Sequence, residues 1–92
     1  MVIYGDYALP VNKDGCVDYC NGHIEMSVEE LYCYLSNEFQ DNIVLIAWLP
    51  NIRQIYISYE VLKITFYNGE KISLYDEDTA KYLKKCIANE YK

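Results

Sequence analysis

Hydrophobic and polar residues alternate along the second half of the chain with the period of a half-buried β-strand. The alternation predicts strands over residues 54–59, 61–66 and 70–75. The apolar positions shift by one residue between Tyr59 and Leu62. We therefore expect a bulge or a tight bend around Glu60 instead of one straight strand.

The loop between the last two strands determines how they pair. A two-residue Asn68-Gly69 loop would set apolar residues opposite polar ones on each face. A three-residue loop over Tyr67-Asn68-Gly69, with Gly69 in the left-handed conformation as a G1 bulge, gives the better match. It pairs Phe66 with Glu70, Ile64 with Ile72 and Leu62 with Leu74. One face of this hairpin is then almost purely apolar, and we expect this register.

The first half of the chain is less regular. Residues 43–49 are apolar on both faces, which is typical of a strand covered on both sides or lying in the centre of a sheet. Residues 1–26 are rich in turn formers and predict an irregular segment, with a short edge strand or loose packing at its start. Asp14-Gly15 is the expected site of a small hairpin.

Two helices are predicted, at about residues 28–39 and 79–91. Ser27 and Glu30 form a capping box at the start of the first helix. Its apolar stripe comprises Val28, Leu31, Tyr32, Leu35 and Phe39. Asp76, Glu77 and Asp78 provide the N-cap and the acidic first turn of the second helix. Its buried stripe comprises Ala80, Leu83, Cys86 and Ile87, and Glu77 and Lys81 have the spacing of an ion pair.

These elements predict an α+β fold for a single domain over residues 1–92, since so short a chain cannot bury a second core. The expected architecture is a three- to four-stranded antiparallel sheet, a β-meander, with two helices packed on one face. The longest apolar run is far below the roughly 20 residues that span a bilayer. We therefore expect a soluble, cytoplasmic protein that does not bind membranes.

The net charge of −6 is distributed unevenly along the chain. Residues 1–50 hold eight carboxylates and one cation, whereas residues 51–92 hold six carboxylates and seven cations. An acidic field repels nucleic acid and favours basic protein surfaces, although solubility alone also explains such an excess. We expect no direct nucleic-acid binding.

Cysteine and histidine cluster loosely in the first third of the chain. Cys16, Cys20, His23 and Cys33 are four side chains that together could surround a tetrahedral zinc ion. Their spacing lacks the Cys-x2-Cys knuckle of structural zinc sites, so unpaired cysteines are the favoured interpretation and we expect no cofactor. The same residues lack the oxyanion-hole or phosphate-binding signature that would accompany a catalytic cysteine. We therefore expect no enzymatic activity.

The charge and composition favour a non-enzymatic protein-binding module. Eleven tyrosines in 92 residues offer the contact area that protein-binding surfaces use. The predicted partner-binding residues lie on the polar side of the first helix and comprise Glu29, Glu30, Tyr34, Glu38 and Asp41. By analogy of size and charge alone, we expect a small acidic inhibitor that docks on a basic, nucleic-acid-binding surface. Phage-encoded antagonists of restriction or CRISPR nucleases (anti-restriction and anti-CRISPR proteins) act in this way.

Two alternatives remain open. The first is a structural or regulatory subunit that self-associates through its sheet, with exposed Tyr56, Tyr67 and Tyr75, so the chain is expected to be a monomer or a homodimer. The second is a zinc-stapled interaction module built on the cysteine and histidine cluster.

Overall fold

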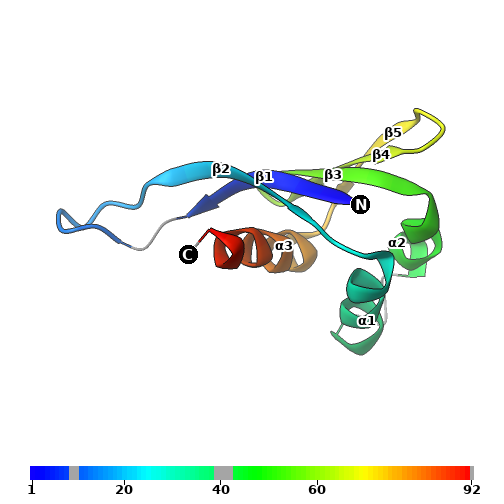
Figure 1. Ribbon diagram of the computed structural model, residues 1–92, viewed down its shortest axis with the longest axis horizontal. Coiled ribbons are helices and arrows are strands. Elements are labelled where there is room, and N and C mark those ends of the chain that lie inside the picture. The colour runs from blue at the N-terminus through cyan, green and yellow to red at the C-terminus, as the bar shows by residue number, and fades with distance from the viewer. Residues whose placement is uncertain (9–10, 39–42, 92) are drawn as a thin grey trace.

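The computed structural model describes residues 1–8, 11–38 and 43–91. Within these residues, five strands form one mixed sheet in the order β2-β1-β3-β4-β5 (Figure 1). The strands are β1 (Val2–Ala8), β2 (Tyr19–Glu25), β3 (Ile52–Ser58), β4 (Val61–Phe66) and β5 (Lys71–Tyr75). The helices are α1 (Val28–Glu38), α2 (Ile43–Trp48), the 3-10 turn η1 (Leu49–Asn51) and α3 (Glu77–Glu90). All of these helices lie on the same side of the sheet (Figure 1). The predicted α+β class is confirmed, but the sheet is larger and the helices are more numerous than expected.

The segment predicted to be irregular, residues 1–26, contains two strands. β1 lies inside the sheet, antiparallel to β2 on one side and parallel to β3 on the other, so the expectation of an all-antiparallel sheet is wrong. Glycine is typical of turns, so Gly5 and Gly22 argue against strands in the sequence. In the structure, each lies inside a strand at a point where other residues approach its backbone closely. A Cβ on Gly5 would lie 2.7 Å from the backbone oxygen of Ile57. A Cβ on Gly22 would lie 2.8–2.9 Å from side-chain atoms of Ile87, Tyr91 and Tyr7.

The loop between these two strands forms a tight turn, as the sequence predicts at Asp14-Gly15. The side-chain oxygen of Asn12 accepts hydrogen bonds from the backbone N–H groups of Asp14 and Cys16, both at 3.0 Å. Gly15 takes the left-handed conformation with φ of 79°. Residues 11–18 project beyond the sheet, at the end of the molecule opposite α1 (Figure 1).

The predicted strand over residues 43–49 is a helix, α2, that continues into η1. Leu45 and Leu49 are fully buried, whereas Val44 is 54% exposed, so the run is not covered on both sides. The buried residues Leu45 and Leu49 are four positions apart, which is helical spacing. A short apolar run fits either a strand or a helix, and here the packing on α1 decides for the helix.

The strands of the second half agree with the sequence prediction. β4 and β5 pair Ile64 with Ile72 and Leu62 with Leu74. Gly69 has φ of 90°, and the N–H of Phe66 donates to the backbone oxygen of Glu70 at 2.9 Å, as the G1 bulge requires. The expected bend around Glu60 is a tight two-residue turn between β3 and β4, in which Tyr59 takes a positive φ of 56°.

The helix signals are also confirmed in their main features. The hydroxyl of Ser27 accepts from the N–H of Glu30 at 3.1 Å, and a carboxylate oxygen of Asp76 accepts from the N–H of Thr79 at 3.1 Å. Lys81 and Glu77 form an ion pair at 2.9 Å. Tyr32 departs from the prediction because it is half exposed and does not join the buried stripe of α1. Phe39, also assigned to that stripe, lies outside the described residues.

Every helix among the described residues is too short or too polar to span a lipid bilayer. The core between the sheet and the helices is formed by fully buried aliphatic residues from each layer. They include Ile3, Leu31, Leu35, Leu45, Leu49, Ile55, Ile57, Leu62, Ile64, Leu83 and Ile87. The opposite face of the sheet carries no helix within the described chain (Figure 1).

Because residues 43–48 form a helix, we expect two neighbouring substitutions to have very different effects on the free energy of unfolding. Leu45→Ala should lower the free energy of unfolding by about 2–5 kcal/mol, because it leaves a cavity in the core. Val44→Ala should change it by less than about 0.5 kcal/mol, because the side chain faces solvent. Urea titrations followed by circular dichroism measure both values. Equal, large losses would instead indicate a strand buried on both faces.

Candidate functional site

The predicted acidic surface lies at the start of α1. Glu29 and Glu30 are exposed in its first turn, where the helix dipole also favours negative charge. In the described part of the chain, neither carboxylate has a cation within ion-pair distance. Glu38 is the last residue of α1, and its side chain lies outside the described set, as does all of Asp41. The structure therefore brings Glu29 and Glu30 together and does not place the other two acidic groups.

Tyr34 does not lie on the open surface as the helical pattern suggested. Its ring stacks on the ring of Tyr82 from α3, with centroids 3.6 Å apart and planes 3° from parallel. Burial raises the pKa of the Tyr82 phenol to about 12, with further contributions from the Cys86 thiol and the charge of Glu30. Tyr34 therefore joins α1 to α3 and holds the acidic turn against the rest of the molecule. Sequence periodicity could not reveal this contact, because it depends on a helix more than 40 residues away.

The residues considered for zinc are distributed over three separate elements. Cys16 lies in the exposed loop, Cys20 on β2 and Cys33 on the exposed side of α1. Cys20 and His23 are three residues apart in a strand, so their side chains point to opposite faces of the sheet. No group of three or more potential metal ligands occurs among the described residues. The structure thus does not bring the four candidates together.

His23 is engaged by the C-terminal end of α3. The Tyr91 hydroxyl accepts from the backbone N–H of His23 at 3.2 Å and donates to its backbone oxygen at 3.1 Å. The Tyr91 ring stacks on Tyr7, with centroids 5.5 Å apart. Tyr91 therefore occupies hydrogen-bonding groups on the outer edge of β2, which would otherwise be open to pairing with another strand.

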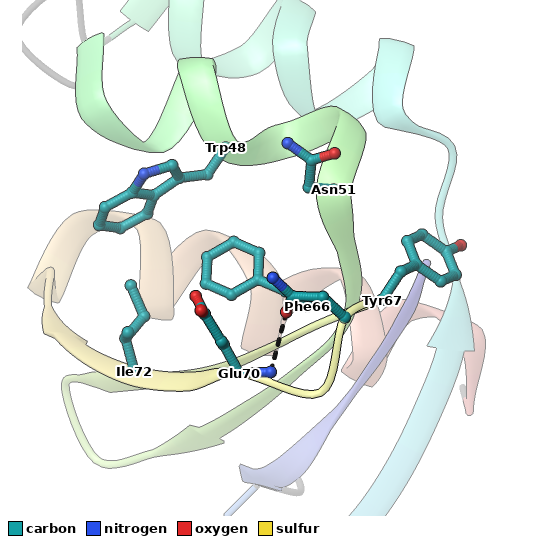
Figure 2. Close-up of a pocket in the computed structure, with 7 residues that line it drawn as sticks. Trp48, Asn51, Phe66, Tyr67, Glu70 and Ile72 are labelled. Carbon is teal, nitrogen blue, oxygen red and sulfur yellow. Dashed lines mark hydrogen bonds between the residues drawn. The ribbon is translucent and has the colours of Figure 1, made fainter.

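A hollow that the sequence did not predict lies between α2–η1 and the turn of the β4–β5 hairpin (Figure 2). It has a volume of about 430 Å³ and is lined by Trp48, Asn51, Phe66, Tyr67, Asn68, Glu70 and Ile72. The rings of Trp48 and Phe66 meet edge to face, with centroids 5.9 Å apart and planes at 85°. Figure 2 shows the Glu70 carboxylate turned toward the space bounded by these two rings and Ile72. The hollow therefore combines aromatic and aliphatic walls with one carboxylate.

Backbone hydrogen bonds hold the two sides of this hollow together. The N–H of Tyr67 donates to the backbone oxygen of Asn51 at 2.9 Å, which connects the hairpin turn to η1. The N–H of Glu70 donates to the side-chain oxygen of Asn68 at 2.9 Å (Figure 2), and its carbonyl accepts from Phe66. These bonds fix the backbone on both sides of the hollow before any ligand binds. The apolar run over residues 43–49 predicts a strand, so the sequence does not predict this hollow. The spacing of Leu45 and Leu49 is the signal in the sequence that fits a helix.

The uncovered face of the sheet is the third candidate surface. Tyr4 and Tyr56 contact each other at its centre, with centroids 5.0 Å apart, and the Lys63 ammonium lies 5.7 Å from the Tyr56 ring centroid. Tyr19 on β2 and Tyr75 on β5 are about 70% exposed at its two sides. The strand alternation places Asp6 and Glu25 on the β1–β2 side of this face and Lys63 and Lys71 on the β4–β5 side. The face therefore carries carboxylates on one side and lysines on the other, with the Glu25 carboxylate 3.3 Å from the Met1 ammonium.

Neither a protein-family model, nor a curated protein sequence, nor a solved structure matches this chain.

The ring stack between α1 and α3 makes a prediction for stability. Tyr34→Ala should lower the free energy of unfolding by about 2 kcal/mol, because the substitution removes a stacked aromatic pair from the junction of two helices. Tyr32→Ala is the matched control on the same helix, and it should cost less than about 0.5 kcal/mol because Tyr32 is half exposed. Thermal and urea denaturation give both values. Equal costs would contradict a structural role for the stack.

Proposed function

We propose that this protein is a non-enzymatic inhibitor that docks through an acidic surface on a basic surface of a larger protein. The observation that carries the proposal is the exposed pair Glu29 and Glu30, which has no cationic partner in the described structure. Carboxylates that are left unpaired keep their long-range field, which speeds the approach of a basic partner. The proposed surface also includes Glu38 and Asp41, which follow in the sequence. Tyr34 connects α1 to α3 through its stack on Tyr82.

The basic surface of the partner is proposed to be one that otherwise binds nucleic acid. A small protein with a net charge of −6 competes for such a surface by presenting carboxylates where phosphates would lie. Phage proteins that antagonise CRISPR or restriction nucleases are the functional class that fits this chemistry. The support is the charge distribution of this chain and the contact of α1 with α3 through the Tyr34–Tyr82 stack.

The proposal predicts that charge reversal at α1 abolishes partner capture. The double variant Glu29→Lys/Glu30→Lys should lose specific capture of a nucleic-acid-handling protein from nuclease-treated bacterial lysate, because like charges would then face each other. The captured protein is identified by mass spectrometry, and added DNA or RNA should displace wild type from it. Circular dichroism verifies that the variant is folded.

The matched control is Asp14→Lys/Asp18→Lys in the projecting loop, at the far end of the molecule from α1 (Figure 1). It changes the net charge by the same amount and should retain capture at physiological salt. Equal loss in both double variants would attribute capture to net charge and not to α1. Capture of the same proteins by wild type and both variants would contradict the acidic-surface proposal altogether.

A second candidate function is self-association through the uncovered sheet face, and its charge distribution favours this candidate. Two sheets packed face to face about a two-fold axis parallel to the strands place β2 of one copy opposite β5 of the other. Glu25 and Lys71 lie at the two ends of one row across the sheet, which also contains Val2, Gln54 and Thr65. The two-fold arrangement sets Glu25 opposite Lys71 of the second copy, and Tyr4 opposite Lys63.

Self-association predicts a dimer that depends on Lys71. Lys71→Glu should weaken dimerisation about tenfold or more, because each copy would then place like charges opposite each other at two symmetry-related positions. Lys85→Glu, on the exposed side of α3, should leave the dimer unchanged. Sedimentation velocity over a range of concentrations measures the association. A wild-type chain that stays monomeric at high concentration would exclude this function.

A further inference from the structure

We propose that the hollow between α2–η1 and the β4–β5 turn binds an arginine side chain of the protein partner. The inference rests on the proposed protein-binding function and specifies one contact that the acidic surface alone does not supply. It adds a defined binding site with a defined ligand chemistry, namely a planar cation on an aliphatic stem.

The walls of the hollow match the two parts of an arginine side chain. A guanidinium group stacks on aromatic rings through its flat face and is attracted by their π-electrons. The rings of Trp48 and Phe66 are nearly perpendicular, with centroids 5.9 Å apart. One ring therefore offers its face and the other its edge to a planar group in the hollow. Ile72 lies beside them and provides an apolar surface for the methylene stem (Figure 2).

Glu70 supplies the charge that selects a cation. Its carboxylate is turned into the hollow, and no cation in the described chain lies within ion-pair distance of it. The neighbouring Lys71 belongs to the alternate face of β5, away from the hollow. A carboxylate forms two parallel hydrogen bonds with a guanidinium group, which a lysine ammonium cannot do. Arginine is therefore favoured over lysine.

The same charge disfavours the other possible occupants. A phosphate or a carboxylate would be repelled by Glu70 and by the acidic excess of the whole chain. A purely aliphatic or aromatic anchor would cover the Glu70 carboxylate without providing a hydrogen bond, which costs free energy. The Tyr67–Asn51 and Glu70–Asn68 hydrogen bonds fix the backbone on both sides of the hollow, so binding orders little of the main chain.

The test uses the fact that Trp48 is the only tryptophan of the chain, so its indole signal reports directly on the hollow. The probe is the blocked tripeptide acetyl-Gly-Arg-Gly-amide, titrated into the full chain and followed by the indole N–H resonance and by fluorescence. We expect saturable binding with a dissociation constant of about 1–10 mM, as suits a single exposed cation–π and ion-pair contact. The citrulline tripeptide, neutral but nearly equal in shape, should bind at least about fivefold more weakly.

A glutamine variant at Glu70 separates the role of the carboxylate from that of the aromatic walls. Glu70→Gln should weaken the arginine peptide about five- to tenfold and leave the citrulline peptide unchanged. Glu60→Gln, in the β3–β4 turn, is the matched control and should bind like wild type. Glu60 and Glu70 are both exposed turn residues, so unchanged thermal denaturation is expected for each variant.

Three results would overturn the proposal. The indole signal could show no saturable response to the arginine peptide, or the same response to arginine and citrulline. The lysine tripeptide could bind as tightly as the arginine one, which would reduce the site to a general cation site. These outcomes are independent of partner capture. If the peptide fails to bind and capture is intact, only the proposal for the hollow is rejected. If the peptide binds and charge-dependent capture fails, the proposal for the α1 surface is rejected and that for the hollow stands.

Discussion

The parallel pairing of β1 with β3 joins two parts of the protein that would otherwise be a separate hairpin and a separate meander. It sets Ile3 beside Ile55 and places Gly5 against Ile57, where even a methyl group would meet the backbone oxygen. Strands that pair in parallel need a long crossover connection, and here the connection contains β2, α1 and α2. The crossover helices and α3 share one face of the sheet, which leaves the other face open. The candidate surfaces all follow from this arrangement.

The sequence predicts most of the second half of the chain, and in the first half it predicts α1 and the turn at Asp14-Gly15. The β4–β5 register follows from matching apolar residues across a turn, and Gly69 in that turn needs its left-handed conformation. Such signals are local, because the residues that interact lie within a few positions of one another. The N-caps of α1 and α3 are equally local, and both occur where the sequence places them.

The strands β1 and β2 and the helix α2 escape prediction because their structure depends on contacts between distant residues. Gly5 and Gly22 indicate a turn by type, but they lie inside strands where Ile57, Tyr7 and Ile87 approach closely. No local pattern distinguishes these two uses of glycine. Similarly, an apolar run such as residues 43–49 fits a strand or a helix, and only the packing of Leu45 and Leu49 on α1 decides between them.

In the candidate site, too, local features can be predicted from the sequence and contacts between distant residues cannot. Charge is visible in a sequence, so the acidic turn of α1 can be predicted. The helical pattern places Tyr34 on the surface because its stacking partner belongs to α3. Trp48, Phe66 and Ile72 look like core residues in any hydrophobic pattern. They border a hollow because α2 turns into η1 and because the Tyr67–Asn51 hydrogen bond brings the hairpin turn beside it.

The two proposed contacts act over different distances. Unpaired carboxylates at α1 act over roughly the Debye length of about 8 Å at physiological salt and so influence which partners approach. The hollow acts only in contact, where two aromatic rings and one carboxylate must fit a single side chain. α2 lies between α1 and the β4–β5 hairpin at the same end of the molecule (Figure 1), so the elements that carry both proposed contacts are neighbours. A basic surface rich in arginine, as in proteins that bind phosphates, would suit both the proposed α1 contact and the proposed contact in the hollow.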